Sequence, residues 1–264
     1  MPDPIFSGLE DGRYLPSGHA RGPWDPSGAL HGGATAALLT RALERLAPPT
    51  TGLAIAHLDF QLVRAIPLVP LELTAEVEHP GRRVLRLAAA LRTDQVVAQG
   101  RALCLLPVPD SVAALPEPEP DVLTPGPQEA KPVRLDPTGA NESFGATAIE
   151  IRFLTGDFGP GPSAVWTRLR RPLVADEEPS PLMRAAAAAD LGNGIGSALR
   201  WEQYLFINAD LSIALWRPPR GEWIGVRART LLGAGGVALA ASVLYDEAGA
   251  FGRGQQSLLV QART

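Results

Sequence analysis

The most restrictive feature of this sequence is a pattern that occurs twice: a helix of small residues followed by segments in which apolar and polar residues alternate. The first helix is expected at residues 34–47, directly after His31-Gly32-Gly33. The second is expected at residues 182–190, where Ser180 supplies an N-cap and Pro181 suits the first helical position. Its run of alanines permits close approach of another helix or a sheet. A repeated unit of this size predicts duplication and a pseudo-two-fold structure.

After each helix the period of the apolar residues changes from 3.6 to 2, which indicates β-strands. The alternation covers residues 58–62, 71–77 and 85–91 in the first half, and 211–215, 224–230 and 237–243 in the second. Further strands are expected at 148–153 and 164–170. Short turns such as His79-Pro80-Gly81 separate the strands, as in antiparallel meanders. The predicted class is therefore α+β, with an antiparallel sheet wrapped on a central helix in each half.

A break in composition separates the two halves. Residues 107–137 contain nine prolines, several acidic residues and little apolar periodicity. Such a segment is typical of an extended, semi-rigid surface linker. The sequence therefore predicts an N-terminal unit at 1–106, a proline-rich linker at 107–137 and a C-terminal unit at 138–264.

Charge and cysteine content exclude several classes of protein. The net charge is −4, and Lys131 is the only lysine, so nucleic acid is not expected as a partner. The single cysteine, Cys104, excludes an internal disulfide framework and a cysteine-based zinc site, and its apolar neighbours favour a buried thiol. No signal-peptide pattern and no bilayer-length apolar stretch occurs. We therefore expect a cytoplasmic protein that has no membrane partner.

Several short motifs occur in a consistent order along the chain. They are His31-Gly32-Gly33-Ala34 at the first helix, Phe60 to Pro67 at a strand end, Ala189-Asp190 at the second helix, Trp216-Arg217-Pro218, and Gln255-Gln256-Ser257 on the last strand. In this order and spacing the chain resembles the type II acyl-CoA thioesterases, which have a double-hotdog fold. The resemblance covers nearly the whole chain outside the proline-rich segment. It implies hydrolysis of acyl-CoA thioesters to free acid and CoA.

The resemblance also implies an active site of three residues: Asp190 at the end of the second helix, Asn208 on the next strand and Gln256 on the last strand. Asn208 departs from the family, whose better-known members have Thr or Ser there. An Asp can accept a proton from water while Asn and Gln amides hold that water in line. Each residue also has a structural interpretation. Asp190 can simply end its helix, Gln256 can point to solvent, and Asn208 can belong to a turn.

Substrate-binding roles are expected at the start of the first helix. Backbone N–H groups of Gly32 and Gly33 suit a developing oxyanion, because the absent side chains allow close approach. His31 and His57 are also candidate substrate-binding residues, although a capping role for His31 and a solvated strand position for His57 fit the sequence equally well. The histidines show no metal-ligand spacing, so neither a metal nor another cofactor is expected. The sequence also contains no G-x-S-x-G motif.

Two other functions stay open at this stage. One is a hydratase or dehydratase on the same architecture, a reaction that usually requires an Asp–His pair, whereas no histidine follows His79. The other is a non-catalytic protein that binds acyl-CoA or acyl groups. A homodimer is expected, because exposed sheet edges often pair.

Overall fold

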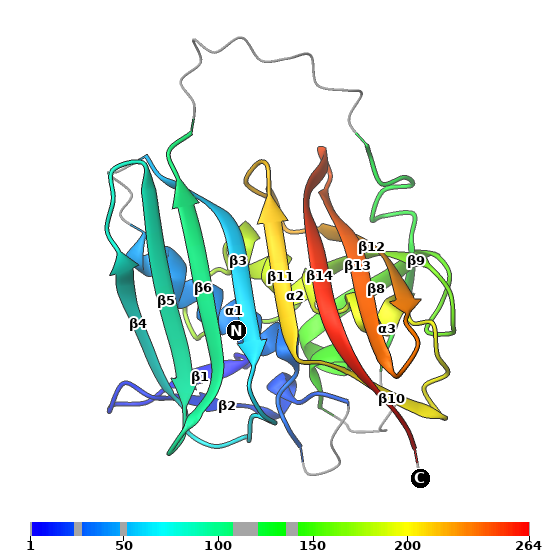
Figure 1. The fold of residues 1–264 in the computed structure, drawn as a ribbon, viewed down its shortest axis with the longest axis horizontal. Coiled ribbons are helices and arrows are strands. Elements are labelled where there is room, and N and C mark those ends of the chain that lie inside the picture. The colour runs from blue at the N-terminus through cyan, green and yellow to red at the C-terminus, as the bar shows by residue number, and fades with distance from the viewer. Residues whose placement is uncertain (1, 24–27, 48–51, 108–120, 136–141, 264) are drawn as a thin grey trace.

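The computed structural model describes residues 2–23, 28–47, 52–107, 121–135 and 142–263. In the first half, helix α1 (Gly32–Leu46) is followed by four strands, β3 (Ala54–Leu62), β4 (Glu72–His79), β5 (Val84–Arg92) and β6 (Val96–Leu105). Before the helix lie two short strands, β1 (Phe6–Gly8) and β2 (Tyr14–Pro16), and a 3₁₀ turn, η1 (Gly18–Ala20). Figure 1 shows α1 behind this part of the sheet. The predicted helix and strands of the first half are confirmed.

The second half repeats the plan with additional elements. A π-helical turn, η3 (Phe144–Ala148), leads into β8 (Ile149–Thr155) and β9 (Ser163–Leu169). Helices α2 (Pro181–Ala189) and α3 (Gly192–Ile195) follow. The remaining strands are β10 (Tyr204–Asn208), β11 (Asp210–Leu215), β12 (Ile224–Leu232), β13 (Val237–Asp246) and β14 (Gly249–Ala262). Ser180 caps α2 as predicted, because its hydroxyl accepts a hydrogen bond from Met183 N–H.

Both halves contribute to one antiparallel sheet. Its strand order is β4-β5-β6-β3-β11-β14-β13-β12-β9-β8-β7, where β7 is the short strand Lys131–Val133, and β10 pairs with β14. The halves meet where β11 pairs with β3, with Ala214 opposite His57 and Asp210 opposite Gln61. Figure 1 shows the sheet curving around the helices, with β3 and β11 side by side at its centre. The predicted α+β class is confirmed.

The two central helices pack closely because their facing residues are small. All five alanines of α2, Ala185 to Ala189, are buried. A Cβ atom at Gly33 of α1 would lie only 2.6 Å from the Ala187 carbonyl oxygen. One hydrophobic cluster includes residues of both helices and of strands from both halves. Cys104 is buried in this cluster, as predicted. The halves therefore share a core.

Part of the segment predicted as a linker packs against the second half. Residues 108–120 and 136–137 of it lie outside the described residues. Strand β7 (Lys131–Val133) pairs with β8, and Leu123 and Ala130 are buried beside Trp166 and Tyr245. These apolar side chains contribute to a small second core, which proline content alone does not reveal. Within the described parts of the chain, no helix is long and apolar enough to cross a membrane.

Candidate active site

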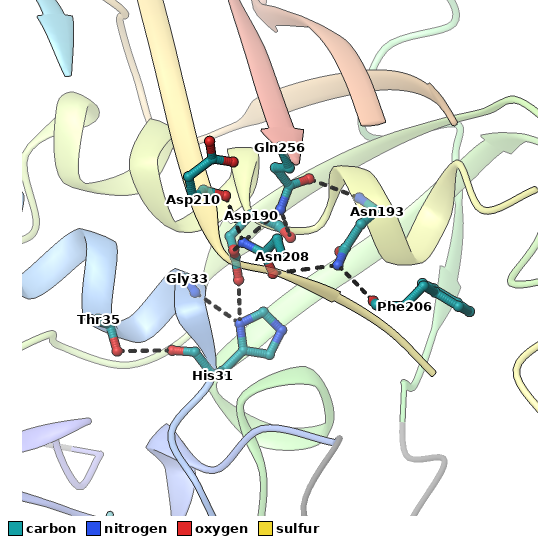
Figure 2. A network of polar contacts seen from close by, with 9 residues as sticks. All are labelled: His31, Gly33, Thr35, Asp190, Asn193, Phe206, Asn208, Asp210 and Gln256. Atoms are coloured by element: carbon teal, nitrogen blue, oxygen red, sulfur yellow. Dashed lines mark hydrogen bonds and ion pairs between the residues drawn. The ribbon is translucent and has the colours of Figure 1, made fainter. Parts of the chain in front are cut away.

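Five elements converge on one polar cluster beside a cavity of about 720 Å³. Figure 2 shows side chains from the start of α1, the ends of α2 and β10, the short helix α3 and strand β14 meeting there. The central members of the cluster are almost completely buried; they are His31, Asp190, Asn193, Asn208 and Gln256. All of them except Gln256 also line the cavity.

Asp190 is the C-cap residue of α2, and its carboxylate lies against the beginning of α1. A Cβ atom at Gly32 would lie 2.6 Å from Asp190 Oδ1 and 2.7 Å from Oδ2, so only glycine leaves room for this carboxylate. An acidic group at the C-terminus of its own helix is electrostatically unfavourable. The partial positive charge at the N-terminus of α1 offsets that effect. The N-terminus of α1 therefore explains why an acidic residue is tolerated at the C-terminus of α2.

Two side-chain amides donate to one oxygen of this carboxylate. Asn208 Nδ2 lies 2.9 Å from Asp190 Oδ1, and Gln256 Nε2 lies 3.3 Å from the same atom. Gln256 Nε2 also lies 3.1 Å from the Asp190 carbonyl oxygen. Asn208 ends β10 and faces Leu258 on the neighbouring strand, so it is a strand residue and not part of an isolated turn. The structure therefore brings together the three residues that the family resemblance implied.

His31 approaches the other carboxylate oxygen. Its Nδ1 atom lies 2.9 Å from Asp190 Oδ2 and also accepts a hydrogen bond from Gly33 N–H at 2.9 Å. The imidazole ring is held by Phe144, whose ring centroid lies 4.6 Å away. Nδ1 has a single lone pair, so accepting from Gly33 N–H and sharing a proton with Oδ2 are alternative states of the same atom. His31 thus lines the cavity and either caps α1 or forms an Asp–His pair.

The Asp–His pair removes one argument against a hydratase. That argument relied on the absence of a histidine after His79, whereas His31 comes from the first half of the chain and reaches Asp190 in the second. The pair connects two segments that are distant in sequence. Only the packing of α1 against α2 brings them together.

The other predicted residues occupy different positions. Gly32 lines the cavity, whereas Gly33 N–H is engaged by His31. His57 is not among the residues that line the cavity; its Nε2 atom lies 2.9 Å from Ser212 Oγ, where β3 pairs with β11. The position of His57 suits a contact between the two halves.

Sequence reasoning missed Asn193, which lies between the two amides that contact Asp190. Its backbone N–H donates to Gln256 Oε1 at 2.9 Å. Its side-chain Nδ2 lies 3.4 Å from both Asn208 Oδ1 and the Phe206 carbonyl oxygen. The sequence offered one indication of its role, an Asn three residues after Asp190. That Asn lies in a segment whose residues are also typical of a helix end.

The rest of the cavity wall is mainly apolar. Its large apolar members come from both halves; they are Leu30, Leu62, Ile66, Leu135, Phe158, Leu191, Ile195, Trp201, Phe206, Ile207 and Leu259. Arg64, Arg134 and Glu202 also line it. Among the described residues no group of three or more His, Cys, Asp or Glu side chains is placed to hold a metal ion. The cavity therefore combines an apolar wall, two arginines and a glutamate, and one polar cluster.

An antiparallel sheet wrapped around a pair of central helices, built from two similar halves, defines the class of protein as a double-hotdog fold. Residues 20–105 match the model of the acyl-CoA thioesterase N-terminal domain, and residues 109–260 match that of the C-terminal domain. The chain belongs to the acyl-CoA thioesterase family and is a thioesterase. Because the second match begins at residue 109, it places β7 with the C-terminal domain, as the packing does.

Solved structures agree with this fold. A putative thioesterase from Novosphingobium aromaticivorans DSM 12444 is 25% identical with a TM-score of 0.71, over 97% of this chain and 98% of that one. A hot dog fold protein of unknown function from Alicyclobacillus acidocaldarius is 14% identical, TM-score 0.72, over 97% and 96%. The acyl-CoA thioesterase II TesB2 from Mycobacterium marinum is 15% identical, TM-score 0.65, over 98% and 96%. No functionally curated protein matches the chain. The predicted double hotdog is confirmed.

Proposed function

We propose that this chain hydrolyses acyl-CoA thioesters with a water molecule that Asp190 activates, and that no covalent intermediate forms on the protein. The family supplies the reaction class, thioester hydrolysis. The setting of Asp190 is the observation that carries the residue assignment. Its buried carboxylate lines the cavity, receives amide N–H groups at Oδ1 and faces His31 at Oδ2.

Asp190 serves as the general base in this proposal. It takes a proton from water as the water oxygen attacks the thioester carbonyl carbon, and the carbonyl π electrons move to the carbonyl oxygen. His31 Nδ1, at 2.9 Å from Oδ2, shares the proton. When the carbonyl re-forms, the C–S bond breaks, its electron pair leaves on sulfur, and the shared proton passes to the thiolate. The products are the free acid and CoA thiol.

The developing oxyanion requires a hydrogen-bond donor at the cavity wall. Gly33 is not among the residues that line the cavity, whereas Gly32 lines it at the N-terminus of α1. We therefore assign the oxyanion role to Gly32 N–H, which the positive end of the helix dipole supports. The sequence suggested this role for the N–H groups of both Gly32 and Gly33, and we now assign it to Gly32 alone.

The two amides have different roles. Asn208 lines the cavity and can contact the water as well as Asp190. Gln256 does not line the cavity, and its Nε2 donates hydrogen bonds to Asp190 from the side away from the cavity. We assign Asn208 to the water and Gln256 to positioning of the Asp190 carboxylate. Truncation of Gln256 should therefore lower kcat less than removal of the Asp190 charge does.

The lining of the cavity supports an acyl-CoA substrate. Apolar side chains from both halves suit an acyl chain. Arg64 and Arg134, which also line the cavity, suit the phosphate groups of CoA, because a guanidinium binds phosphate through paired N–H groups. His57 has no part in this assignment.

The test is release of free thiol from a series of acyl-CoAs of rising chain length. Asp190→Asn should lower kcat by about 10²–10⁴-fold, the usual contribution of a general base, while retaining acyl-CoA binding. Gln256→Ala should lower kcat less. Asp94→Asn, an exposed carboxylate in a turn, is the matched control and should behave as wild type. Binding of acyl-CoA without turnover by the wild-type protein would instead support a non-catalytic acyl-binding protein.

A hydratase or dehydratase is the second candidate, and the contact between His31 and Asp190 favours it. Such an enzyme adds water across the carbon–carbon double bond of an enoyl thioester and releases no thiol. Incubation with trans-2-enoyl-CoA separates the two reactions. Loss of the enoyl absorbance without thiol release supports the hydratase, and thiol release supports the thioesterase.

Two properties remain predictions. A homodimer would have a mass in solution of about twice 27.9 kDa by light scattering, and a single chain mass would contradict it. The cytoplasmic location can be tested by fractionation of cells that produce the protein.

A further inference from the structure

The polar cluster contains three amides, and the direction in which each one points decides whether Asp190 receives N–H groups. A side-chain amide can rotate by half a turn, which exchanges its oxygen for its NH₂ group. Only partners that are fixed as donors or acceptors determine the orientation. Backbone N–H and carbonyl groups are fixed in this sense.

Two backbone groups orient the amides around Asn193. The backbone N–H of Asn193 donates to Gln256 Oε1, so Gln256 must turn its NH₂ group toward Asp190. The Phe206 carbonyl accepts from Asn193 Nδ2, so the Asn193 side chain must present N–H groups on that side. The same Nδ2 atom lies 3.4 Å from Asn208 Oδ1.

Asn208 has a donor on one side and acceptors on the other, so it turns its oxygen toward Asn193 and its nitrogen toward Asp190 and the Asp210 carbonyl, which is a fixed acceptor. Its Nδ2 atom donates to Asp190 Oδ1 at 2.9 Å and to the Asp210 carbonyl at 3.1 Å. In the reversed orientation, Asn208 Oδ1 would face two oxygens, and its NH₂ group would face the NH₂ group of Asn193. Both contacts would be repulsive in a site that is almost completely buried.

We propose that Asn193 is a positioning residue: it supplies the donors that hold the oxygens of both amides, while the Asp190 and Asp210 carbonyls accept from their nitrogens, so that Asn208 and Gln256 present N–H groups to Asp190. It acts on Gln256 through its backbone and on Asn208 through its side chain (Figure 2). The proposal deepens the proposed function and rests on it. The side-chain part can be tested separately, because substitution of Asn193 by a residue other than proline retains its backbone N–H.

A double-mutant cycle tests the side-chain contact. A hydroxyl group rotates freely and has no reversed orientation, so Asn208→Ser removes the need for Asn193 to orient this side chain. Asn193→Ala should lower kcat by about tenfold in the wild-type background but by less than about threefold in the Asn208→Ser background. Equal losses in the two backgrounds would overturn the proposal, because a merely structural role for Asn193 does not depend on the identity of residue 208.

The split between kcat and KM gives a second readout. Asn193→Asp places a carboxylate that only accepts opposite Asn208 Oδ1, so the contact between the two side chains becomes repulsive and Asn208 is driven away from its N–H contact with Asp190. We expect kcat to fall further in Asn193→Asp than in Asn193→Ala, with KM little changed. Wild-type kcat in Asn193→Asp would contradict the proposal. Asn193→Ser, which retains a small polar group, replaces Asn193→Ala in the cycle if the alanine variant does not fold.

A measurement without turnover separates failure of this proposal from failure of the proposed function. The side-chain amide resonances of Asn208 in ¹H–¹⁵N spectra are assigned by their loss in Asn208→Ser. They should shift or broaden in Asn193→Ala, because Asn208 Oδ1 loses its donor and only the acceptors on the other side still hold the amide. Unchanged resonances would overturn the role of Asn193 whether or not acyl-CoA is hydrolysed. Absence of hydrolysis by the wild type, with shifted resonances in the variant, would overturn only the proposed reaction.

Discussion

At the scale of single residues, the active site depends on the absence of a side chain at Gly32. In Gly32→Ala the new methyl carbon would lie 2.6 Å from Asp190 Oδ1, so the carboxylate must move away from α1 and from its amide donors. We expect kcat to fall by about 100-fold, the effect of a displacement near 1 Å in a catalytic group. Gly8→Ala, where a Cβ atom meets nothing within 4 Å, is the control. Wild-type kinetics in Gly32→Ala would show that the close approach is unimportant.

Glu44 provides a residue-scale prediction about stability and pH. Burial raises the pKa of its carboxyl group, and the hydrogen bond that Ser180 donates offsets this only in part. A group whose folded pKa is raised stabilises the fold below its unfolded pKa, and that contribution is lost as pH rises through the folded value. Glu44→Gln should therefore have a higher Tm than wild type at pH 8 and a similar Tm near pH 4.5.

The control for this experiment is Glu10→Gln, which changes an exposed carboxylate. Thermal unfolding of the three proteins between pH 4.5 and 8 provides the measurement. A Tm difference between Glu44→Gln and wild type that is the same at every pH would contradict the assignment, because a packing effect does not titrate.

The sequence indicated most residues of the polar cluster but not the hydrogen bonds between them. Asp190, Asn208 and Gln256 were placed by resemblance to a family, and the structure brings them together with His31 and Gly32. Asn193 was missed because its proposed function requires α3 to pack against the paired strands β10 and β14, which no local pattern encodes. The pairing of His31 with Asp190 was missed for a similar reason, since it requires α1 and α2, from different halves, to pack side by side with the start of α1 at the end of α2.

At the scale of elements, α2 requires small side chains where it packs against α1. Ala187 is fully buried, and its carbonyl oxygen would lie 2.6 Å from a Cβ atom at Gly33 of α1. We expect Ala187→Leu to lower the free energy of unfolding by about 1–3 kcal/mol, because overpacking forces the helices apart. Urea denaturation measures the change. Ala248→Leu, at an exposed turn, is the control. An equally small change in the free energy of unfolding of both variants would mean that α1 and α2 can accommodate a large side chain between them.

Elements with strong periodicity were predicted well, and short or irregular ones were not. The alternation of apolar and polar residues located β3, β5, β12 and β13, because one face of each strand packs on the core. Strands β1, β2 and β7 are only three residues long, which is too short for a period to appear. Proline content placed residues 121–135 in a linker, although Leu123 and Ala130 are buried against the second half.

At the scale of the whole molecule, the two halves depend on each other for both core and active site. They pair along β3 and β11, and the His57–Ser212 hydrogen bond crosses the same junction. The Asp190 carboxylate comes from the second half, whereas Gly32 and His31 come from the first. The covalent connection between the halves is therefore not what assembles the site.

This leads to a prediction for a chain cut between its halves. A protease site inserted within residues 108–120 and then cleaved should leave both fragments associated and active, because the shared sheet and core remain. We expect the fragments to elute together in size-exclusion chromatography and to retain kcat within about twofold. The Tm should fall and become dependent on protein concentration, because unfolding now also separates two chains. The uncut insertion variant is the control. Separate elution of the fragments, with loss of thiol release, would mean that the pairing of β3 with β11 and of α1 with α2 cannot hold the halves together without the covalent link.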